Sequence, residues 1–168
     1  IPYEDCALQP PVFGEILRFV EEFLDQYHIP AYDETTGTGL VRHVYLRQGT
    51  VSGELMLCLV INGSELPHCS QFINRITDRF PELASIMLNI NRERTNVILG
   101  KKSRLIYGKD HITDTLCGVQ FDLSPMAFYQ VNHDGAEQLY RIAGEFAQLT
   151  PDDVLLDLYC GAGTIGLS

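Results

Sequence analysis

The segment Val154-Leu155-Leu156-Asp157-Leu158-Tyr159-Cys160-Gly161-Ala162-Gly163-Thr164-Ile165-Gly166 lies near the end of a chain of 168 residues. Its first part, residues 154–158, is an apolar run typical of a short buried strand. The glycines that follow have the spacing Gly-x-Gly-x-x-Gly, which lets the backbone pass close to a ligand and points amide groups toward it. Strand and loop together predict the opening of a doubly wound α/β domain with a cofactor at the loop.

The glycine spacing alone leaves the cofactor open. A dinucleotide site has an acidic residue about 20 positions further on that binds the ribose, and the sequence ends at Ser168 before that position. Asp157, four positions ahead of Gly161, gives the form Asp-x-x-x-Gly-x-Gly. This form is the usual first motif of S-adenosylmethionine-dependent methyltransferases, so it favours a methyl donor over a dinucleotide. A glycine-rich turn without a ligand is the third interpretation.

Upstream of residue 123 the pattern changes to an α+β one. Apolar residues recur at helical spacing after Pro10-Pro11 and again over residues 70–80, which predicts two helices. Runs rich in strand formers lie at 40–47, 54–61, 85–91, 96–99, 104–107, 114–116 and 119–123, and the first two are expected to form a hairpin. The run 55–61 is apolar on both faces and is expected to be a central strand. This order predicts a central α+β domain with a mostly antiparallel sheet.

The boundary between the two patterns is placed near residue 123. Residues 1–123 are expected to form the central domain, and residues 124–168 the helix, first strand and glycine loop of an incomplete Rossmann-like α/β methyltransferase domain. Asp134 to Glu137 has the spacing of a capping box, and one apolar helix face follows: Ala136, Leu139, Tyr140, Ala143, Phe146 and Ala147. A lone first strand has no neighbours, so residues from 150 onward are expected to be unpaired or paired in a non-native way.

Composition limits the partners. A formal charge of -10 and a pI of about 4.8 argue against a self-sufficient nucleic-acid binder, and the densest basic cluster, Lys101-Lys102 with Arg104, is interpreted as a solvated turn. The chain has five cysteines, an odd number, and no C-x-x-C motif, so the sequence indicates neither a disulfide framework nor a zinc site. Cysteines without a disulfide pattern favour a reducing compartment, the cytoplasm. No apolar run is long enough for a membrane span, so no membrane partner is expected.

A longer stretch decides between the cofactors. The blocks SPMAFYQVN (124–132), AEQLY (136–140) and LLDLYCGAGTIGL (155–167) resemble the RNA (uracil-5-)methyltransferases, which make 5-methyluridine in ribosomal and transfer RNA. GLVRHVYLRQG, SGELMLCLVING and SIMLNINRERTNVILG resemble the part of that family that precedes its catalytic domain. Members combine an RNA-binding β-barrel, a central domain and a C-terminal methyltransferase domain. This chain is similar to the central domain and the start of the catalytic one.

The resemblance implies particular site residues. The positions that match cofactor contacts or the cofactor loop of the family are Gln130, Tyr159, Asp157, Gly161 and Gly163. Phe128 and Asn132 match the rest of the F-x-Q-x-N block and are expected near the substrate base; spacing alone would make them a core aromatic and a helix cap. Cys6 stands where many members have the fourth ligand of an iron–sulfur cluster, although an ordinary thiol in a member without a cluster fits equally.

The family's chemistry places the catalytic residues elsewhere. A Cys thiolate adds to carbon 6 of uracil, carbon 5 then attacks the methyl group of S-adenosylmethionine, and a base removes the carbon-5 proton before the Cys is expelled. In the family the nucleophilic Cys and the base lie far downstream of the glycine loop. Both are therefore expected beyond Ser168, the chain alone is expected to be inactive, and Cys160 is not expected to be the nucleophile.

The resemblance also implies a partner for the complete protein. This partner is RNA, with ribosomal RNA expected in preference to transfer RNA. Two other functions stay open from the residues: a non-enzymatic module that docks RNA or protein, and part of a dinucleotide-binding oxidoreductase. The sequence gives no oligomeric state.

Overall fold

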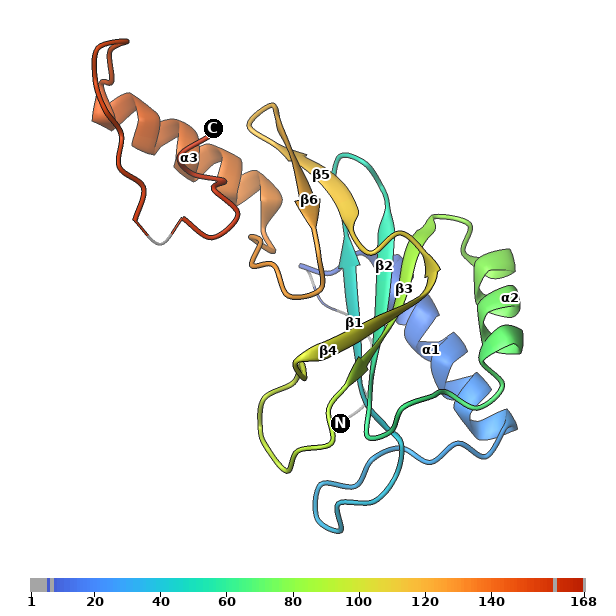
Figure 1. Ribbon diagram of the computed structural model, residues 1–168. Coiled ribbons are helices and arrows are strands. Elements are labelled where there is room, and N and C mark those ends of the chain that lie inside the picture. Colours follow the sequence, from blue (N-terminus) through green and yellow to red (C-terminus); the bar gives the residue numbers. More distant parts are fainter. Residues whose placement is uncertain (1–5, 7, 159, 168) are drawn as a thin grey trace.

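A computed structural model describes residues 6, 8–158 and 160–167 (Figure 1). The elements are α1 (Pro11–Gln26), β1 (Val41–Gln48), β2 (Leu55–Ile61), α2 (Cys69–Arg79), β3 (Leu83–Ile90), β4 (Lys102–Gly108), β5 (Ile112–Leu116), β6 (Val119–Leu123) and α3 (His133–Ala147). Both helices predicted upstream of residue 123 are confirmed, and so are the expected strands other than 96–99, a segment that is a loop.

The main sheet has the order β1-β2-β3-β4. The predicted hairpin is confirmed as the antiparallel pair β1–β2, and β3–β4 is antiparallel as well. β2 and β3 are parallel, because α2 carries the chain back between them. The sheet is therefore mixed, and the expected antiparallel character holds for two of its three pairings. All seven residues of β2 are buried, which confirms the predicted central strand.

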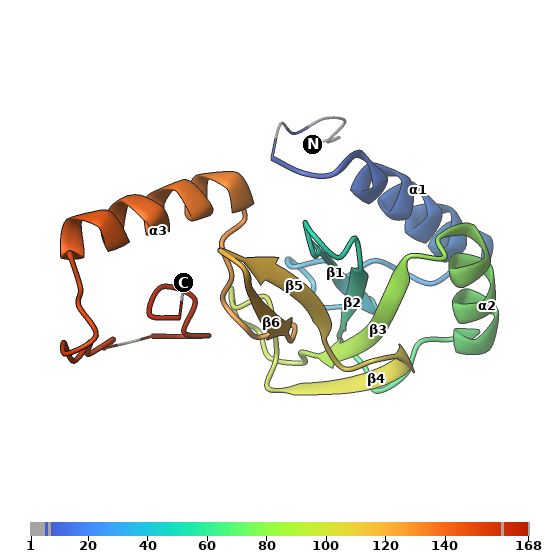
Figure 2. The ribbon, with the colours of Figure 1, turned by 90° about the horizontal axis from the view of Figure 1, so that it is seen from above.

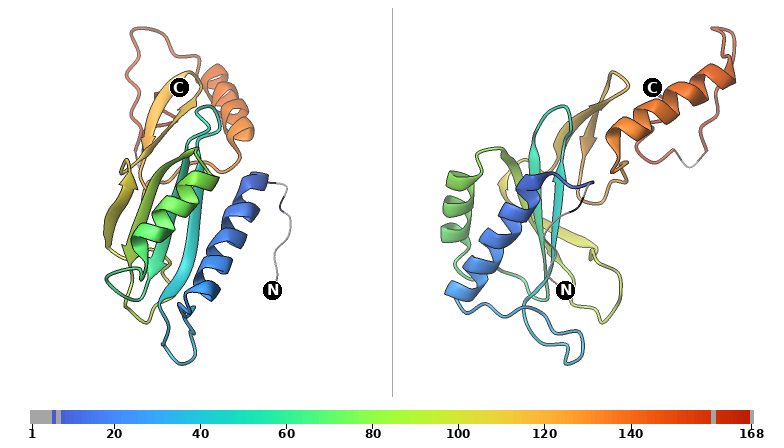
Figure 3. Two further views of the ribbon diagram at one scale, coloured as in Figure 1. Left: turned by 90° about the vertical axis from the view of Figure 1, so that its right-hand side faces the viewer. Right: turned by 180° about the vertical axis from the view of Figure 1, so that it is seen from behind.

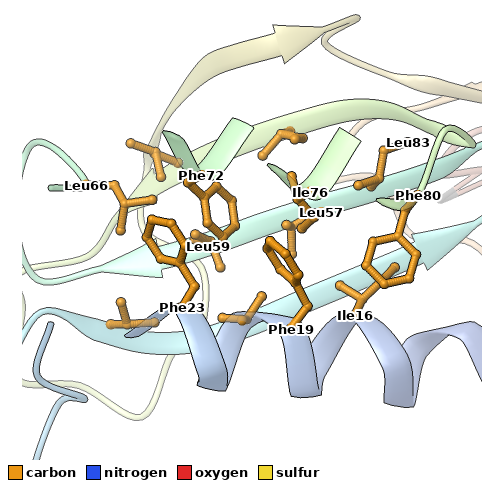
Figure 4. Close-up of a cluster of buried hydrophobic side chains, with 14 of the residues drawn as sticks. Ile16, Phe19, Phe23, Leu57, Leu59, Leu66, Phe72, Ile76, Phe80 and Leu83 are labelled. Atoms are coloured by element: carbon orange, nitrogen blue, oxygen red, sulfur yellow. The ribbon is translucent and has the colours of Figure 1, made fainter. Parts of the chain in front are cut away.

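The first core lies between this sheet and the two helices α1 and α2, which cover the same face (Figures 2 and 3). The ring of Phe72 on α2 lies 6.0 Å from that of Phe19 and 5.0 Å from that of Phe23, both on α1. Figure 4 shows these rings stacked over Leu57 and Leu59 of β2. Close aromatic packing of this kind stabilises the layer.

A second core joins the β5–β6 hairpin to α3 on the other side of the sheet (Figure 2). Its buried members are Met56, Ile112, Leu116, Phe121, Leu123, Ala136 and Tyr140. The hairpin turns at Cys117 and Gly118, whose φ angles are 49° and 79°. Two consecutive positive φ values fit the twist of a tight hairpin, which explains the glycine at the second position. Met56 of β2 is the point where the main sheet enters this second core.

α3 begins at a different cap from the expected one. The side chain of Asn132 accepts a hydrogen bond from the Gly135 amide at 3.0 Å, so Asn132 is the N-cap and the expected capping box beginning at Asp134 is wrong. Only part of the expected apolar face is covered: Ala136 and Tyr140 are buried, whereas the side chain of Phe146 is 83% exposed. The helix is therefore anchored to the hairpin by its N-terminal half.

The segment after α3 departs from the expected fold. Residues 154–158 form no strand, because no other strand lies beside them in the described part of the chain to pair with their backbone groups. Val154 is 95% exposed and Leu156 is 75% exposed. The expected first strand of a Rossmann-like domain is thus not confirmed, whereas the expectation of an unpaired segment agrees with the structure. None of the helices in the described part of the chain is long and apolar enough to cross a membrane.

Candidate functional site

A pocket of about 560 Å³ lies between the start of α1, the end of β1 and the segment 125–131. This volume suits a small ligand or one nucleoside. Gln130, expected at the cofactor, lines the pocket, and so do Phe128, Tyr45 and Arg47. Phe128 is 74% exposed, so its alternative interpretation as a core aromatic is wrong. The wall therefore combines aromatic faces, an amide and a guanidinium group.

Arg47 at the end of β1 holds the segment that carries Gln130. Its Nη1 donates to the carbonyl oxygen of Ser124 at 3.1 Å, and its Nη2 donates to that of Ala127 at 2.7 Å. The same Nη2 donates to the Tyr45 hydroxyl at 2.6 Å. A guanidinium group has several donors in a fixed plane, so one side chain can hold two carbonyls at once. We call these contacts the Arg47 clamp.

A buried carboxylate holds the same segment from the other side. Asp114 of β5 is 1% exposed and accepts hydrogen bonds from the Val51 amide at 2.8 Å and the Tyr129 hydroxyl at 3.1 Å. Burial raises the pKa of Tyr129, and the charge of Asp114 raises it further. Tyr129 therefore stays protonated and donates to Asp114 at neutral pH. Arg47 and Asp114 therefore hold three residues that precede Gln130, namely Ser124, Ala127 and Tyr129.

His133 ties α3 to the hairpin next to this site. Its Nε2 donates to the Thr115 carbonyl at 2.8 Å, and its Nδ1 lies 3.5 Å from Oδ1 of Asp134. Burial alone lowers the pKa of His133, but the hydrogen bond to Thr115 and the neighbouring carboxylates outweigh it and raise the pKa. Asn132, expected near the substrate base, uses its side-chain oxygen to cap α3. The structure therefore gives Asn132 a structural role.

Two glycines of the loop have backbone conformations that favour glycine. Gly161 and Gly163 have φ angles of 57° and 77°, and a side chain at Gly161 would meet nothing within 4 Å. Oδ2 of Asp157 is buried and has no hydrogen-bond partner among the described residues. A buried acceptor without a partner is costly and marks a place for a donor from outside. These residues fit a ligand that carries an amino or hydroxyl group.

The loop and the pocket are separate in this structure. Neither Asp157 nor Gly161 nor Gly163 lines the 560 Å³ pocket, which has Gln130 in its wall. The loop instead touches α3, where the hydroxyl of Thr164 lies 3.2 Å from that of Tyr140. A second pocket of about 600 Å³ runs along α3 beside Cys117, and the glycine loop does not line it either. Tyr159 lies outside the described residues.

The structure gives Cys6 no partners for a cluster. No group of three His, Cys, Asp or Glu side chains in residues 6, 8–158 and 160–167 could hold a metal ion. Cys6 is half-buried and free, and Cys58 is buried in the main sheet, where burial raises the pKa of its thiol to about 11. The described residues therefore supply Cys6 with no further cluster ligands, and its role as a fourth ligand in a longer protein stays a prediction.

Sequence reasoning missed Arg47 and Asp114. Asp114 had a readable signal, since it alternates with Ile112 and Leu116 on the buried face of a short strand. A carboxylate in that position needs hydrogen-bond donors. Arg47 had no such signal, because the carbonyls that it binds lie about 80 residues further along the chain.

Comparisons with known proteins identify similar chains. No family model matches the chain. An RNA methyltransferase of Streptococcus pyogenes serotype M18, named as uncharacterized, is 42% identical over 168 residues, which is 100% of this chain and 36% of that protein. An uncharacterized RNA methyltransferase of Caldanaerobacter subterraneus subsp. tengcongensis is 40% identical over 167 residues, 99% of this chain and 37% of that protein. The chain spans little more than a third of the length of these relatives.

A solved structure is similar as well. The crystal structure of the Pyrococcus abyssi tRNA (uracil-54, C5)-methyltransferase in complex with S-adenosyl-L-homocysteine has a TM-score of 0.82 and 26% identity, over 99% of this chain and 40% of that one. Over its whole length the chain is thus similar to a segment of proteins that are named RNA methyltransferases. It matches a segment of the RNA (uracil-5-)methyltransferase family, which confirms the resemblance of its sequence blocks.

Proposed function

We propose that this chain is part of an S-adenosylmethionine-dependent enzyme that methylates carbon 5 of a uridine in RNA. The observation that carries the proposal is the match over 99% of the chain to a tRNA uracil-5 methyltransferase with S-adenosyl-L-homocysteine bound. Relatives at 40–42% identity are named RNA methyltransferases, which supports an RNA substrate. The preference for ribosomal RNA and the cytoplasmic location stay predictions.

We propose that Gln130, Tyr159, Asp157, Gly161 and Gly163 hold the cofactor. The unpartnered carboxylate oxygen of Asp157 and the open space beside Gly161 support this assignment. When bound, S-adenosylmethionine supplies the methyl group. The role of Asp157 is to accept hydrogen bonds from the cofactor, and that of the glycines is to let the backbone approach it closely. Gln130 is proposed to contribute its side-chain amide from the wall of the 560 Å³ pocket.

The substrate base is proposed to lie in the pocket beside Phe128, whose exposed ring offers a stacking surface. Methyl transfer is proposed to follow the covalent route: a Cys thiolate adds to carbon 6, carbon 5 takes the methyl group, a base removes the carbon-5 proton, and the thiolate leaves. No residue of this chain is proposed as nucleophile or base. Both are expected in a part of the complete protein outside it.

We propose that residues 1–123 form the central domain and residues 124–168 lead into the catalytic domain. The exposure of Val154 and Leu156 supports this division, since exposed apolar residues in a row suit a sheet that has further strands beside it. The fit of the described residues gives no reason to include an iron–sulfur cluster in the proposal.

The test is cofactor titration of the complete protein by calorimetry, followed by methyl transfer to uridine-containing RNA. Gln130→Ala is expected to weaken S-adenosylmethionine binding by on the order of 1–3 kcal/mol. Gln138→Ala, at an exposed position of α3, is the matched control and should leave affinity unchanged. Tighter binding of NAD than of S-adenosylmethionine would refute the proposal, as would the absence of 5-methyluridine in both ribosomal and transfer RNA after incubation.

A further inference from the structure

The basic residues of this acidic chain are concentrated in one place. Between Arg92 and Arg104 lie five of the twelve Lys and Arg residues and one of the 22 acidic residues. This segment, which we call the basic loop, therefore has a formal charge of +4, whereas the rest of the chain has -14. The five cations are Arg92, Arg94, Lys101, Lys102 and Arg104, and all five are exposed.

The basic loop is held in shape by buried polar side chains. The Arg42 side chain is 1% exposed, and its Nη1 donates to the carbonyls of Asn91 at 3.1 Å and Glu93 at 2.7 Å. Asn91 in turn donates to the Val97 carbonyl at 2.8 Å, and Asn89 exchanges two hydrogen bonds with the backbone of Gly100, at 2.6 and 2.9 Å.

Burying one guanidinium and two amides under a surface segment is expensive unless each group is bonded. Asn89 is 0% exposed and Asn91 is 3% exposed. The mechanism proposed above uses none of the three side chains. Their common effect is to turn the loop's carbonyls inward and to fix the positions from which its cations project. A fixed array of cations binds an anionic partner with less loss of conformational entropy than a loose one.

Most of these cations have no acidic partner. Among the described residues, Arg92, Lys101 and Lys102 form no ion pair, and Arg104 lies 3.8 Å from Glu65. Arg94 donates to a backbone carbonyl, that of Thr36, at 2.8 Å. Figure 1 shows the connection from β3 to β4 extending away from both helices, so neither helix covers it. The cations are therefore available to a partner.

The basic loop also reaches the pocket that contains Gln130. Leu99, in the middle of the loop, lines that pocket together with Arg47 and Phe128. A strand of RNA whose phosphates lie on Lys101 and Lys102 could therefore direct a base into the pocket without crossing the acidic remainder of the surface.

We propose that the basic loop binds the phosphate backbone of single-stranded RNA next to the base that enters the Gln130 pocket. The proposal rests on the proposed function for the identity of the partner. Charge complementarity identifies the surface, since binding to RNA depends mainly on neutralising phosphates with Lys and Arg. A single strand is favoured because only an unpaired base can leave its neighbours and enter a pocket.

The experiment is fluorescence anisotropy with a labelled uridine-containing oligoribonucleotide, titrated with this 168-residue chain at increasing salt. Each phosphate contact contributes about 0.7 to the slope of log affinity against log salt, so Lys101→Gln/Lys102→Gln should reduce the slope by about 1.4. Between about 50 and 200 mM salt this change corresponds to about a sevenfold smaller loss of affinity. The matched control is Arg18→Gln/Arg141→Gln, which removes the same charge from exposed positions on α1 and α3.

The expected result is a reduced slope for the loop variant and an unchanged slope for the control. Equal effects of the two variants would overturn the proposal, because binding would then follow net charge alone. No binding by the unaltered chain at about 20 mM salt, where screening is weakest, would also overturn it. Equal affinity for inorganic polyphosphate of the same length would overturn the assignment to RNA.

The outcome is distinguishable from failure of the proposed function. Gln130→Ala tests the cofactor and leaves the basic loop intact. RNA binding mapped to Lys101 and Lys102 together with no affinity of the complete protein for S-adenosylmethionine would support the loop and refute the methyltransferase proposal. Binding of S-adenosylmethionine by the complete protein, together with RNA binding that does not depend on Lys101 and Lys102, would refute only the proposal for the basic loop.

Discussion

Replacing Arg47 by Met should loosen the segment that carries Gln130 while leaving both cores folded. The substitution keeps most of the aliphatic length of the side chain but removes the donors to the Ser124 and Ala127 carbonyls. A hydrogen bond to a charged group contributes about 1.5–3 kcal/mol. Because water can reach part of this site and replace some of the lost donors, we expect a total cost of roughly 2–4 kcal/mol.

The Ala127 amide is the natural reporter of this change, since it donates to the Ser124 carbonyl at 3.2 Å within the clamped turn. A loss of about 2 kcal/mol in the local opening free energy accelerates its hydrogen exchange by about 30-fold. Arg47→Lys should give an intermediate rate, because one ammonium group cannot match the spread of the guanidinium donors.

The matched control is Arg104→Met, which removes an arginine from the exposed edge strand β4. It should leave the exchange of residues 124–131 unchanged. If Arg47→Met and Arg104→Met gave the same exchange rate at Ala127, the clamp would not organise the segment, and the reasoning from its hydrogen bonds would be wrong.

Three further outcomes are expected. Asp114→Ala leaves the Val51 amide and the Tyr129 hydroxyl without an acceptor, so the free energy of unfolding measured in urea should fall by roughly 2–5 kcal/mol. Asp114→Asn keeps one acceptor oxygen and should lower it less. Equal losses in the two variants would contradict these hydrogen bonds. The pKa of His133 is raised in the folded protein, so protonation of His133 stabilises the fold. This stabilisation is complete below the pKa of the unfolded chain, about 6.5, and is lost as the pH rises through the pKa of the folded protein. Exchange of α3 amides should therefore be slower at pH 6 than at pH 8 after correction for intrinsic rates, and His133→Gln should remove that difference; if the variant kept it, another group would be responsible. The raised pKa of Tyr129 means that spectroscopic titration should show one tyrosine ionising later than the others, and Tyr129→Phe should remove this late step without shifting the rest.

The fold was predictable where local pattern and burial coincide. The run from Leu55 to Ile61 is apolar on both faces, and only a strand covered on both sides satisfies such a sequence. The parallel pairing of β2 with β3 was not predictable in the same way, since it depends on the path taken by α2. The strand expected at residues 154–158 is not confirmed, because apolar residues do not supply the neighbouring backbone that a strand needs.

The candidate site shows a similar limit. Gln130 was singled out through the family's F-x-Q-x-N block; it lines a pocket, and its contact with the cofactor stays a prediction. The Arg47 clamp joins residues separated by 77 and 80 positions, and no local pattern reports such a contact. The cluster of Lys101, Lys102 and Arg104 was interpreted as a solvated turn, because composition does not show that Arg42 and two asparagines hold the basic loop in shape.

The alternation of side chains along β2 divides the protein into an inner and an outer layer. Leu55 and Leu57 face α1 and α2, and Met56 between them faces the hairpin and α3. Separation of the outer layer would uncover Met56 but leave its two neighbours packed. We therefore expect the two layers to open as separate cooperative units, with the inner layer staying folded while the outer layer and the residues around Gln130 open and reassemble.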